Sequence, residues 1–136
     1  MKILLIDDET NPIEVYIDNI IDLGHTIVQV TKLDNLKDII DKERTFNWII
    51  LDIMIAPGDF LSLEKSDGGL ISGILLLDFL DTSLPGVPIS VLTNVLDPTI
   101  LDPIKSRVQG RCFKKFIDID PNDDSSLNKL FTIGEN

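Results

Sequence analysis

The sequence predicts an α/β fold in which a parallel sheet of five strands is covered by helices on both faces. Short apolar runs alternate along the chain with segments in which apolar residues recur every three or four positions. Several of the apolar runs stop at a polar residue, which is typical of strands buried on both faces. Alternating strands and helices imply right-handed crossovers, and we expect the strand order 2-1-3-4-5 of doubly wound sheets.

Length and composition restrict the function classes. The 136 residues suit a single domain spanning 1–136, and 43% hydrophobic residues suffice for one core. The net charge of -11 argues against nucleic acid as a partner and favours a metal ion or a basic protein surface. With Cys112 as the single cysteine, and with neither an export signal nor an apolar span of roughly 20 residues, we expect a cytoplasmic protein without a membrane anchor.

The first half of the chain predicts three strands and two helices. The first helix places Ile13, Ile17, Ile20 and Ile21 at helical spacing, and Gly24 follows where a helix would end. The strands are apolar or β-branched runs of four or five residues. We expect strands at Ile3–Ile6, Thr26–Val30 and Trp48–Leu51, and helices at Pro12–Leu23 and Leu33–Ile40.

The second half begins with an extended loop at about 56–69, far longer than the roughly 2 to 6 residues usual between a strand and a helix. Asp97 and Pro98 resemble a helix start, although Pro103 is expected to shorten or kink that helix. We expect helices around Ile74–Leu80, from Pro98 onward and at Ser125–Ile133, and strands at Ile89–Leu92 and Arg111–Ile117.

Three acids follow the first and third predicted strands. Asp7, Asp8 and Asp52 would meet at one edge of the sheet, because these strands are neighbours in the expected order. Crowded carboxylates repel one another unless a cation neutralises them, and magnesium is the expected occupant. Each acid alone could be a solvated turn or a helix cap, but the three together favour a metal site.

The motifs that carry these acids resemble those of response-regulator receiver domains. Residues 3–9, ILLIDDE, are similar to the acidic first strand of that family, and residues 49–54, IILDIM, to its phosphoacceptor strand. Residues 88–94, PISVLTN, place Thr93 at the position of the family's switch hydroxyl. Residues 113–116, FKKF, resemble its fifth strand, which carries a lysine. Lys115 aligns with that lysine better than Lys114 does, but Lys114 stays an alternative. The likeness extends from Met1 to about Ile117 and implies a flavodoxin-like sheet.

The resemblance implies a role for each of these residues. Asp52 would accept a phosphoryl group, and a magnesium ion would be held by Asp8, Asp52 and the backbone carbonyl of Met54, with Asp7 supporting the site. Lys115 would stabilise charge during phosphoryl transfer. The hydroxyl of Thr93 would then move toward the phosphoryl group and carry the signal. Without the resemblance, Thr93 could equally stabilise a turn, and Lys115 could equally be a surface lysine.

Three departures from the family keep alternatives open. Phe116 stands in place of a proline, Cys112 in place of an aromatic residue, and the loop after Asp52 is extended. The first hypothesis is a stand-alone phosphoacceptor with at most self-phosphorylation and self-dephosphorylation activity. It would receive phosphate from a histidine kinase or phosphotransfer protein and contact a downstream protein. Whether the chain forms a homodimer stays open. A pseudo-receiver that signals without phosphorylation is the second hypothesis, and a metal-dependent phosphohydrolase is the third.

Overall fold

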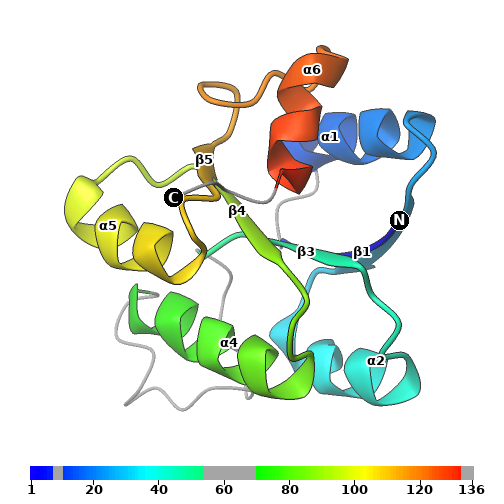
Figure 1. The fold of residues 1–136 in the computed structure, drawn as a ribbon, viewed down its shortest axis with the longest axis vertical. Coiled ribbons are helices and arrows are strands. Elements are labelled where there is room, and N and C mark those ends of the chain that lie inside the picture. Colours follow the sequence, from blue (N-terminus) through cyan, green and yellow to red (C-terminus); the bar gives the residue numbers. More distant parts are fainter. Residues whose placement is uncertain (8–10, 54–69, 133–136) are drawn as a thin grey trace.

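A computed structural model describes residues 1–7, 11–53 and 70–132 (Figure 1). The elements follow in alternation, as expected. The strands are β1 (Lys2–Ile6), β2 (Thr26–Val30), β3 (Trp48–Leu51), β4 (Ile89–Thr93) and β5 (Cys112–Lys114). The α-helices are α1 (Asn11–Asp22), α2 (Leu36–Lys42), α4 (Leu70–Ser83), α5 (Pro98–Arg107) and α6 (Asp124–Leu127), and short 3-10 helices span Leu33–Asn35 and Asn128–Phe131.

The five strands form one parallel sheet in the order β2-β1-β3-β4-β5, which confirms the predicted fold class and strand order. In the centre, Leu4 lies opposite Val28 on one side and Ile49 on the other. Toward the other edge, Thr93 lies opposite Lys114. Because all strands point the same way, the residues that follow β1, β3, β4 and β5 collect at one edge of the sheet.

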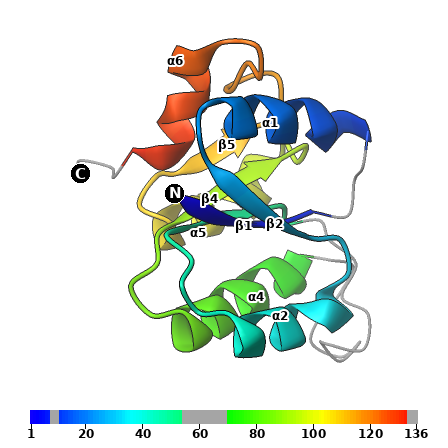
Figure 2. The same ribbon diagram turned by 90° about the vertical axis from the view of Figure 1, so that its right-hand side faces the viewer.

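Helices cover the sheet on both faces (Figure 2). One apolar cluster joins one face of the sheet to α1, α6 and the following 3-10 helix. A second cluster joins the other face to α2, α4 and α5. The central strands β1, β3 and β4 are almost fully buried, as strands covered on both faces must be. The apolar runs in the sequence reflect this double burial.

Helix α1 packs on the sheet through most of the residues predicted at helical spacing. Ile13 and Ile20 are fully buried, as is Tyr16, and Ile17 is partly buried against the same cluster, whereas Ile21 is 48% exposed. Ile13, Tyr16 and Ile20 are three and four positions apart, so they lie on one face of the helix. Ile21 lies off this face because an apolar neighbour of Ile20 points about 100° away from it.

Helix α5 continues through Pro103 to Arg107, so the expectation that this proline would shorten the helix was wrong. A proline in a helix removes one hydrogen bond, here to the carbonyl of Thr99. Both Thr99 and Pro103 are exposed, so water can solvate that carbonyl. The predicted start is confirmed, because Asp97 accepts a hydrogen bond from the backbone N–H of Thr99 at 3.0 Å.

The last two elements are shorter than expected. Strand β5 ends at Lys114 instead of Ile117, because Phe116 adopts a left-handed backbone conformation with φ 64° that no strand can contain. The expected helix over Ser125–Ile133 is α6 followed by a turn of 3-10 helix, and Ile133 lies outside the described residues. The extended loop predicted at 56–69 also lies outside them.

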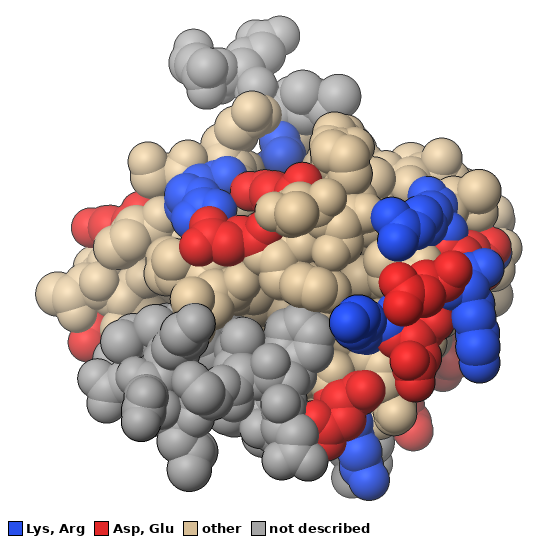
Figure 3. All heavy atoms as spheres, turned by 90° about the horizontal axis from the view of Figure 1, so that it is seen from below, with Lys and Arg blue, Asp and Glu red and all other residues tan. Residues whose placement is uncertain are grey.

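Charges of both signs are interleaved on the face that carries α2 and α4 (Figure 3). One ion pair joins Arg107 of α5 to Asp78 of α4, and another joins Arg44, which follows α2, to Asp41 of that helix. Over the described part of this face, the net charge of -11 therefore does not gather into one acidic patch. No helix within the described ranges is both long and apolar enough to cross a bilayer.

Candidate functional site

Two carboxylates lie buried where the central strands end. The backbone N–H of Asp7 donates to the carbonyl of Val30 at 3.0 Å, and that of Asp52 donates to the carbonyl of Ile6 at 2.9 Å. These bonds extend the ladder of the sheet by one residue and hold both acids at its carboxyl edge. Asp7 is 1% exposed and Asp52 is 3% exposed, so both are withdrawn from bulk water.

The ammonium group of Lys115 joins the two carboxylates. Its Nζ lies 2.8 Å from Oδ2 of Asp7 and 3.3 Å from Oδ2 of Asp52, and the residue is 3% exposed. Lys114, the alternative from the sequence, instead has its backbone N–H bonded to Asp118 Oδ2 at 2.8 Å. Of the two lysines, Lys115 is therefore the one whose ammonium group reaches both acids.

Thr93 connects Asp52 to the loop that follows β4. Its hydroxyl donates to Oδ1 of Asp52 at 3.0 Å, while Lys115 lies 3.3 Å from Oδ2 of the same carboxylate. The same hydroxyl accepts a hydrogen bond from the backbone N–H of Val95 at 3.2 Å. A change in the charge or size of the Asp52 group would thus act on a side chain already bonded to the following loop.

The backbone of β4 also ties Thr93 to Lys115. The carbonyl of Thr93 accepts a hydrogen bond from the N–H of Lys115 at 2.8 Å. The structure therefore brings together four residues selected from the sequence: Asp7, Asp52, Thr93 and Lys115. Asp8 and Met54 lie outside the described residues, so their part in the site stays a prediction.

The chemistry of the donor set fits a magnesium ion. Asp7 and Asp52 carry two negative charges against the single positive charge of Lys115, which leaves these three buried groups with a net negative charge. Magnesium binds through one or two carboxylates and keeps several waters. Within the described ranges no group of three acidic, histidine or cysteine side chains is assembled for a metal. Two carboxylates nonetheless meet the requirement of this ion.

Helix α4 approaches the segment behind Asp52 closely. A Cβ atom built on Gly73 would meet Cβ of Ile53 at 3.2 Å, which is tighter than an ordinary van der Waals contact. Glycine at this position lets the helix pack against the residue that directly follows Asp52. The sequence predicted a helix around Ile74–Leu80 but gave no reason for the glycine that precedes it.

Tyr16 supports the loop after Lys115, a function that the sequence did not suggest. Its hydroxyl accepts from the N–H of Phe116 at 2.8 Å and donates to the carbonyl of Ile119 at 2.6 Å. Burial raises the pKa of Tyr16, which keeps the phenol a neutral donor. The available signal was its position three residues from Ile13 and four from Ile20, on the buried stripe of α1.

Phe116 stands where the resemblance expected proline. Its backbone has φ 64°, which is uncommon for a residue with a side chain, and its ring lies 5.3 Å from that of Tyr16. The hydrogen bond from its N–H to Tyr16 is one that a proline could not make. In this chain the turn after Lys115 is therefore stabilised by a side chain from α1.

Similarity to known proteins was found by comparison of the fold. No family model and no curated protein matches the chain. A response regulator from Burkholderia pseudomallei, solved with a phosphorylated aspartic acid, a calcium ion and citrate, aligns with a TM-score of 0.68 at 20% identity. The alignment covers 95% of this chain and 65% of that protein, so the chain spans less than two thirds of its length.

Two further structures match over almost their whole length. A signal receiver domain of a two-component histidine kinase from Clostridium thermocellum has a TM-score of 0.66 at 17% identity, covering 97% of this chain and 98% of that one. The chemotaxis response regulator CheY4 of Vibrio cholerae has a TM-score of 0.65 at 17% identity, covering 96% and 94%. This chain has the fold of response-regulator receiver domains. In the receiver fold, as in other open α/β sheets, the site expected for ligands is the carboxyl edge, where Asp52 lies.

Proposed function

We propose that this chain is a receiver domain that accepts a phosphoryl group on Asp52. The observation that carries the proposal is the contact of Lys115 with both Asp7 and Asp52, with Thr93 bonded to the second oxygen of Asp52. A buried lysine between two strand-end acids supplies the positive charge that phosphoryl transfer needs. The receiver fold of the solved structures supports the same function.

In the proposed reaction, a carboxylate oxygen of Asp52 attacks the phosphorus atom of the donor. The bond from phosphorus to the donor's leaving group breaks, the leaving group departs with the electron pair, and an acyl phosphate forms on Asp52. Lys115 is placed to stabilise the negative charge on the phosphoryl oxygens, because its Nζ already lies 3.3 Å from Asp52. Thr93 is placed to orient the attacking carboxylate through Oδ1.

Magnesium is the proposed cofactor. Its proposed protein ligands are Asp7, Asp8, Asp52 and the backbone carbonyl of Met54. When bound, it would neutralise charge on the phosphoryl oxygens. The Burkholderia pseudomallei structure contains both a phosphorylated aspartic acid and a calcium ion, which supports a divalent ion of this hard, oxygen-binding type.

The proposed output is a protein contact beside the site. Leu96 follows Thr93 by three residues and is 55% exposed, and Phe116 and Ile117 follow Lys115 and are 52% and 66% exposed. These large apolar side chains come directly after the same ends of two paired strands. The proposed phosphate source is a histidine kinase or phosphotransfer protein in the cytoplasm. The proposed target is a protein that binds this apolar surface. A homodimer, as in the activated NtrC4 receiver, is a further proposed state of the chain.

The test is the intact mass of the protein after incubation with acetyl phosphate, with and without Mg²⁺. We expect one phosphoryl group on the native chain with Mg²⁺, and none on Asp52→Asn. Asp22→Asn, which changes an exposed carboxylate at the end of α1, is the matched control and should be labelled like the native chain. Equal labelling of Asp52→Asn and the native chain would exclude Asp52 as the acceptor.

A pseudo-receiver is the second candidate function, and Phe116 is the observation that favours it. The turn after Lys115 differs from the family pattern in residue type and relies on Tyr16 for support. If the native chain, with its fold intact, forms no phosphoryl adduct with any donor or metal ion, that result would favour an interaction domain that acts without phosphorylation. Release of free phosphate at many turnovers per protein would instead indicate a phosphohydrolase.

A further inference from the structure

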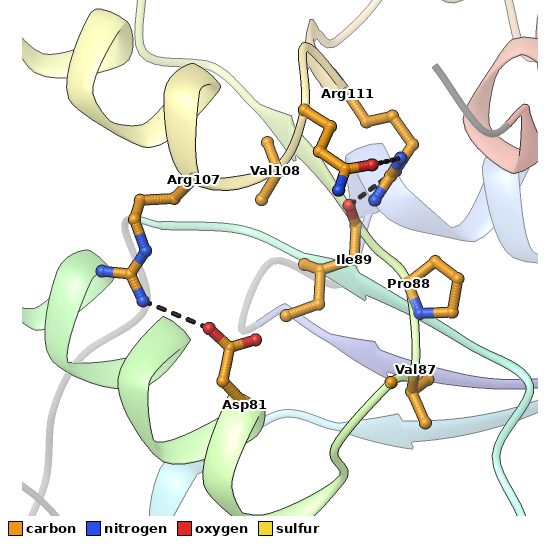
Figure 4. A pocket seen from close by; sticks show the side chains of 9 residues that line it. Asp81, Val87, Pro88, Ile89, Arg107, Val108 and Arg111 are labelled. Carbon is orange, nitrogen blue, oxygen red and sulfur yellow. Dashed lines mark hydrogen bonds and ion pairs between the residues drawn. The ribbon is translucent and has the colours of Figure 1, made fainter. Parts of the chain in front are cut away.

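A cavity of about 320 Å³ lies at the end of β4 opposite Asp52 (Figure 4). Ile89, the first residue of β4, forms part of its wall, whereas Thr93 ends the strand at the other edge, about 13 Å further along the backbone. The volume falls at the lower end of the range of roughly 300 to 1,000 Å³ that is typical of small-molecule sites. The cavity is therefore separate from the proposed phosphoacceptor site.

Arg111 brings a buried positive charge to this cavity. The residue is 7% exposed, and its Nε donates to the carbonyl of Ile89 at 3.0 Å. Its Nη1 makes a long contact of 3.4 Å with Oε1 of Gln109, and its guanidinium lies 5.5 Å from the ring of Trp48. None of these partners is charged, and no carboxylate among the described residues pairs with Arg111.

An uncompensated buried charge is costly, and an arginine cannot relieve the cost by losing its proton at neutral pH. Burial lowers the pKa of Arg111 from its ordinary value, as expected for a cation that has lost solvation without gaining an anion. A guanidinium has five N–H donors, and two of them are used by Ile89 and Gln109. Donors on the exposed side of the group are thus available to an anion in the cavity.

The other charged groups of the cavity limit the kind of anion. Arg107 is engaged by Asp78 at 2.6 Å and by Asp81 at 3.2 Å, so its charge is already compensated. Asp81 itself lines the cavity and lies across Ile89 from Arg111 in Figure 4. A dianion would therefore be repelled by Asp81, whereas a single negative charge beside Arg111 would complete the pairing.

Apart from Gln109, the side chains of the remaining wall are apolar. They belong to Val87, Pro88, Ile89 and Val108. Gln109 already contacts Arg111 through its Oε1, so this part of the wall favours a compact apolar body. A ligand that fits both parts has one carboxylate at Arg111 and a small aromatic or branched aliphatic body on the apolar wall.

We infer that this cavity is a binding site for a small organic monocarboxylate, held by the guanidinium of Arg111 and the apolar residues at the start of β4. Two parallel N–H donors of an arginine match the two oxygens of a carboxylate, which adds direction to the attraction. The site does not depend on phosphorylation of Asp52, so it stands or falls separately from the proposed function.

The test is titration of the folded protein with benzoate, followed through the methyl NMR signals of Val87, Ile89 and Val108. Benzoate has the charge and shape required, benzamide keeps the shape without the charge, and inorganic phosphate supplies a different anion without the apolar body. We expect saturable shifts with benzoate and at least tenfold weaker binding of benzamide and phosphate, because charge-assisted hydrogen bonds are lost with the first and apolar contact with the second.

Variants locate the contact. Arg111→Gln should weaken benzoate binding about tenfold or more, and Arg111→Lys should restore part of it. Lys105→Gln removes an exposed positive charge from α5 outside the cavity and is the matched control, which should bind like the native chain. If Arg111→Gln does not fold, Val87→Phe fills the cavity from its apolar side and should abolish the shifts. Equal binding of benzamide, no shifts at these methyl groups, or unchanged affinity in Arg111→Gln and Val87→Phe would each overturn the inference.

Discussion

The two ends of strand β4 accommodate buried charge in different ways. At the carboxyl end, Lys115 lies between Asp7 and Asp52, and opposite charges compensate each other. At the amino end, the charge of Arg111 contacts a carbonyl, an amide and an aromatic ring, and no carboxylate of the described residues pairs with it. The first arrangement depends on Lys115, because removing it leaves two buried carboxylates without this cation. In the second arrangement, we expect that loss of the Arg111 charge costs little stability and that a bound anion stabilises the protein.

Lys115→Met tests this difference with the largest expected effect. The substitution keeps an unbranched chain in a buried position but leaves Asp7 and Asp52 facing each other without the ammonium group. We expect the free energy of unfolding to fall by about 3 to 5 kcal/mol in EDTA, as for other broken buried pairs. Urea denaturation measures it, and added Mg²⁺ should restore part of the loss.

Lys114→Met is the matched control for this prediction, because Lys114 is half-buried and directly precedes Lys115 at the end of β5. It should change the free energy of unfolding by no more than about 1 kcal/mol. A similar loss for both lysines would mean that the pairing with Asp7 and Asp52 is not what stabilises this end.

Thr93→Val removes a hydroxyl and keeps the shape of the side chain. Oδ1 of buried Asp52 then loses a donor, so we expect a loss of about 1.5 to 3 kcal/mol in urea denaturation. Thr26→Val, at an exposed position of β2, is the control and should have almost no effect. Equal stability of Thr93→Val and the native chain would show that Asp52 does not rely on this hydrogen bond.

Tyr16→Phe removes the hydroxyl that joins the N–H of Phe116 to the carbonyl of Ile119. We expect a loss of about 1 to 3 kcal/mol, because two backbone groups lose a partner. If Asp52 is the phosphoacceptor, labelling by acetyl phosphate should also slow while Mg²⁺ affinity stays unchanged, since Lys115 directly precedes the loosened turn. A matched loss of metal affinity would contradict a role through Lys115.

Arg111→Met gives the smallest effect and completes the comparison. The substitution removes the hydrogen bond to the carbonyl of Ile89 but leaves no charge behind, so we expect a loss of about 1 kcal/mol. The measurement is the same urea series as for Lys115→Met. A loss as large as that of Lys115→Met would show that both ends depend on their cation equally.

Most of the fold could be predicted because strands covered on both faces must be apolar throughout, and that pattern is visible in Ile3–Ile6 and Trp48–Leu51. The site followed from strand order, which places the residue after each run at the same edge. The end of β5 could not be predicted, since Phe116 has no feature that signals a left-handed backbone. The burial of Arg111 was also hidden, because it depends on contacts with Ile89 and Trp48, which lie far from it along the chain.

The sheet order also bears on how the chain folds during its synthesis. Strand β1 is apolar on both faces, and its partners β2 and β3 are made later, the second ending at Leu51. At translation rates of about 5 to 20 residues per second, the interval from Ile6 to Leu51 lasts roughly 2 to 9 s. Throughout that time the edge of β1 that will pair with β3 stays open and must be kept from wrong partners. The nascent chain is therefore expected to need a chaperone most before its third strand has left the ribosome.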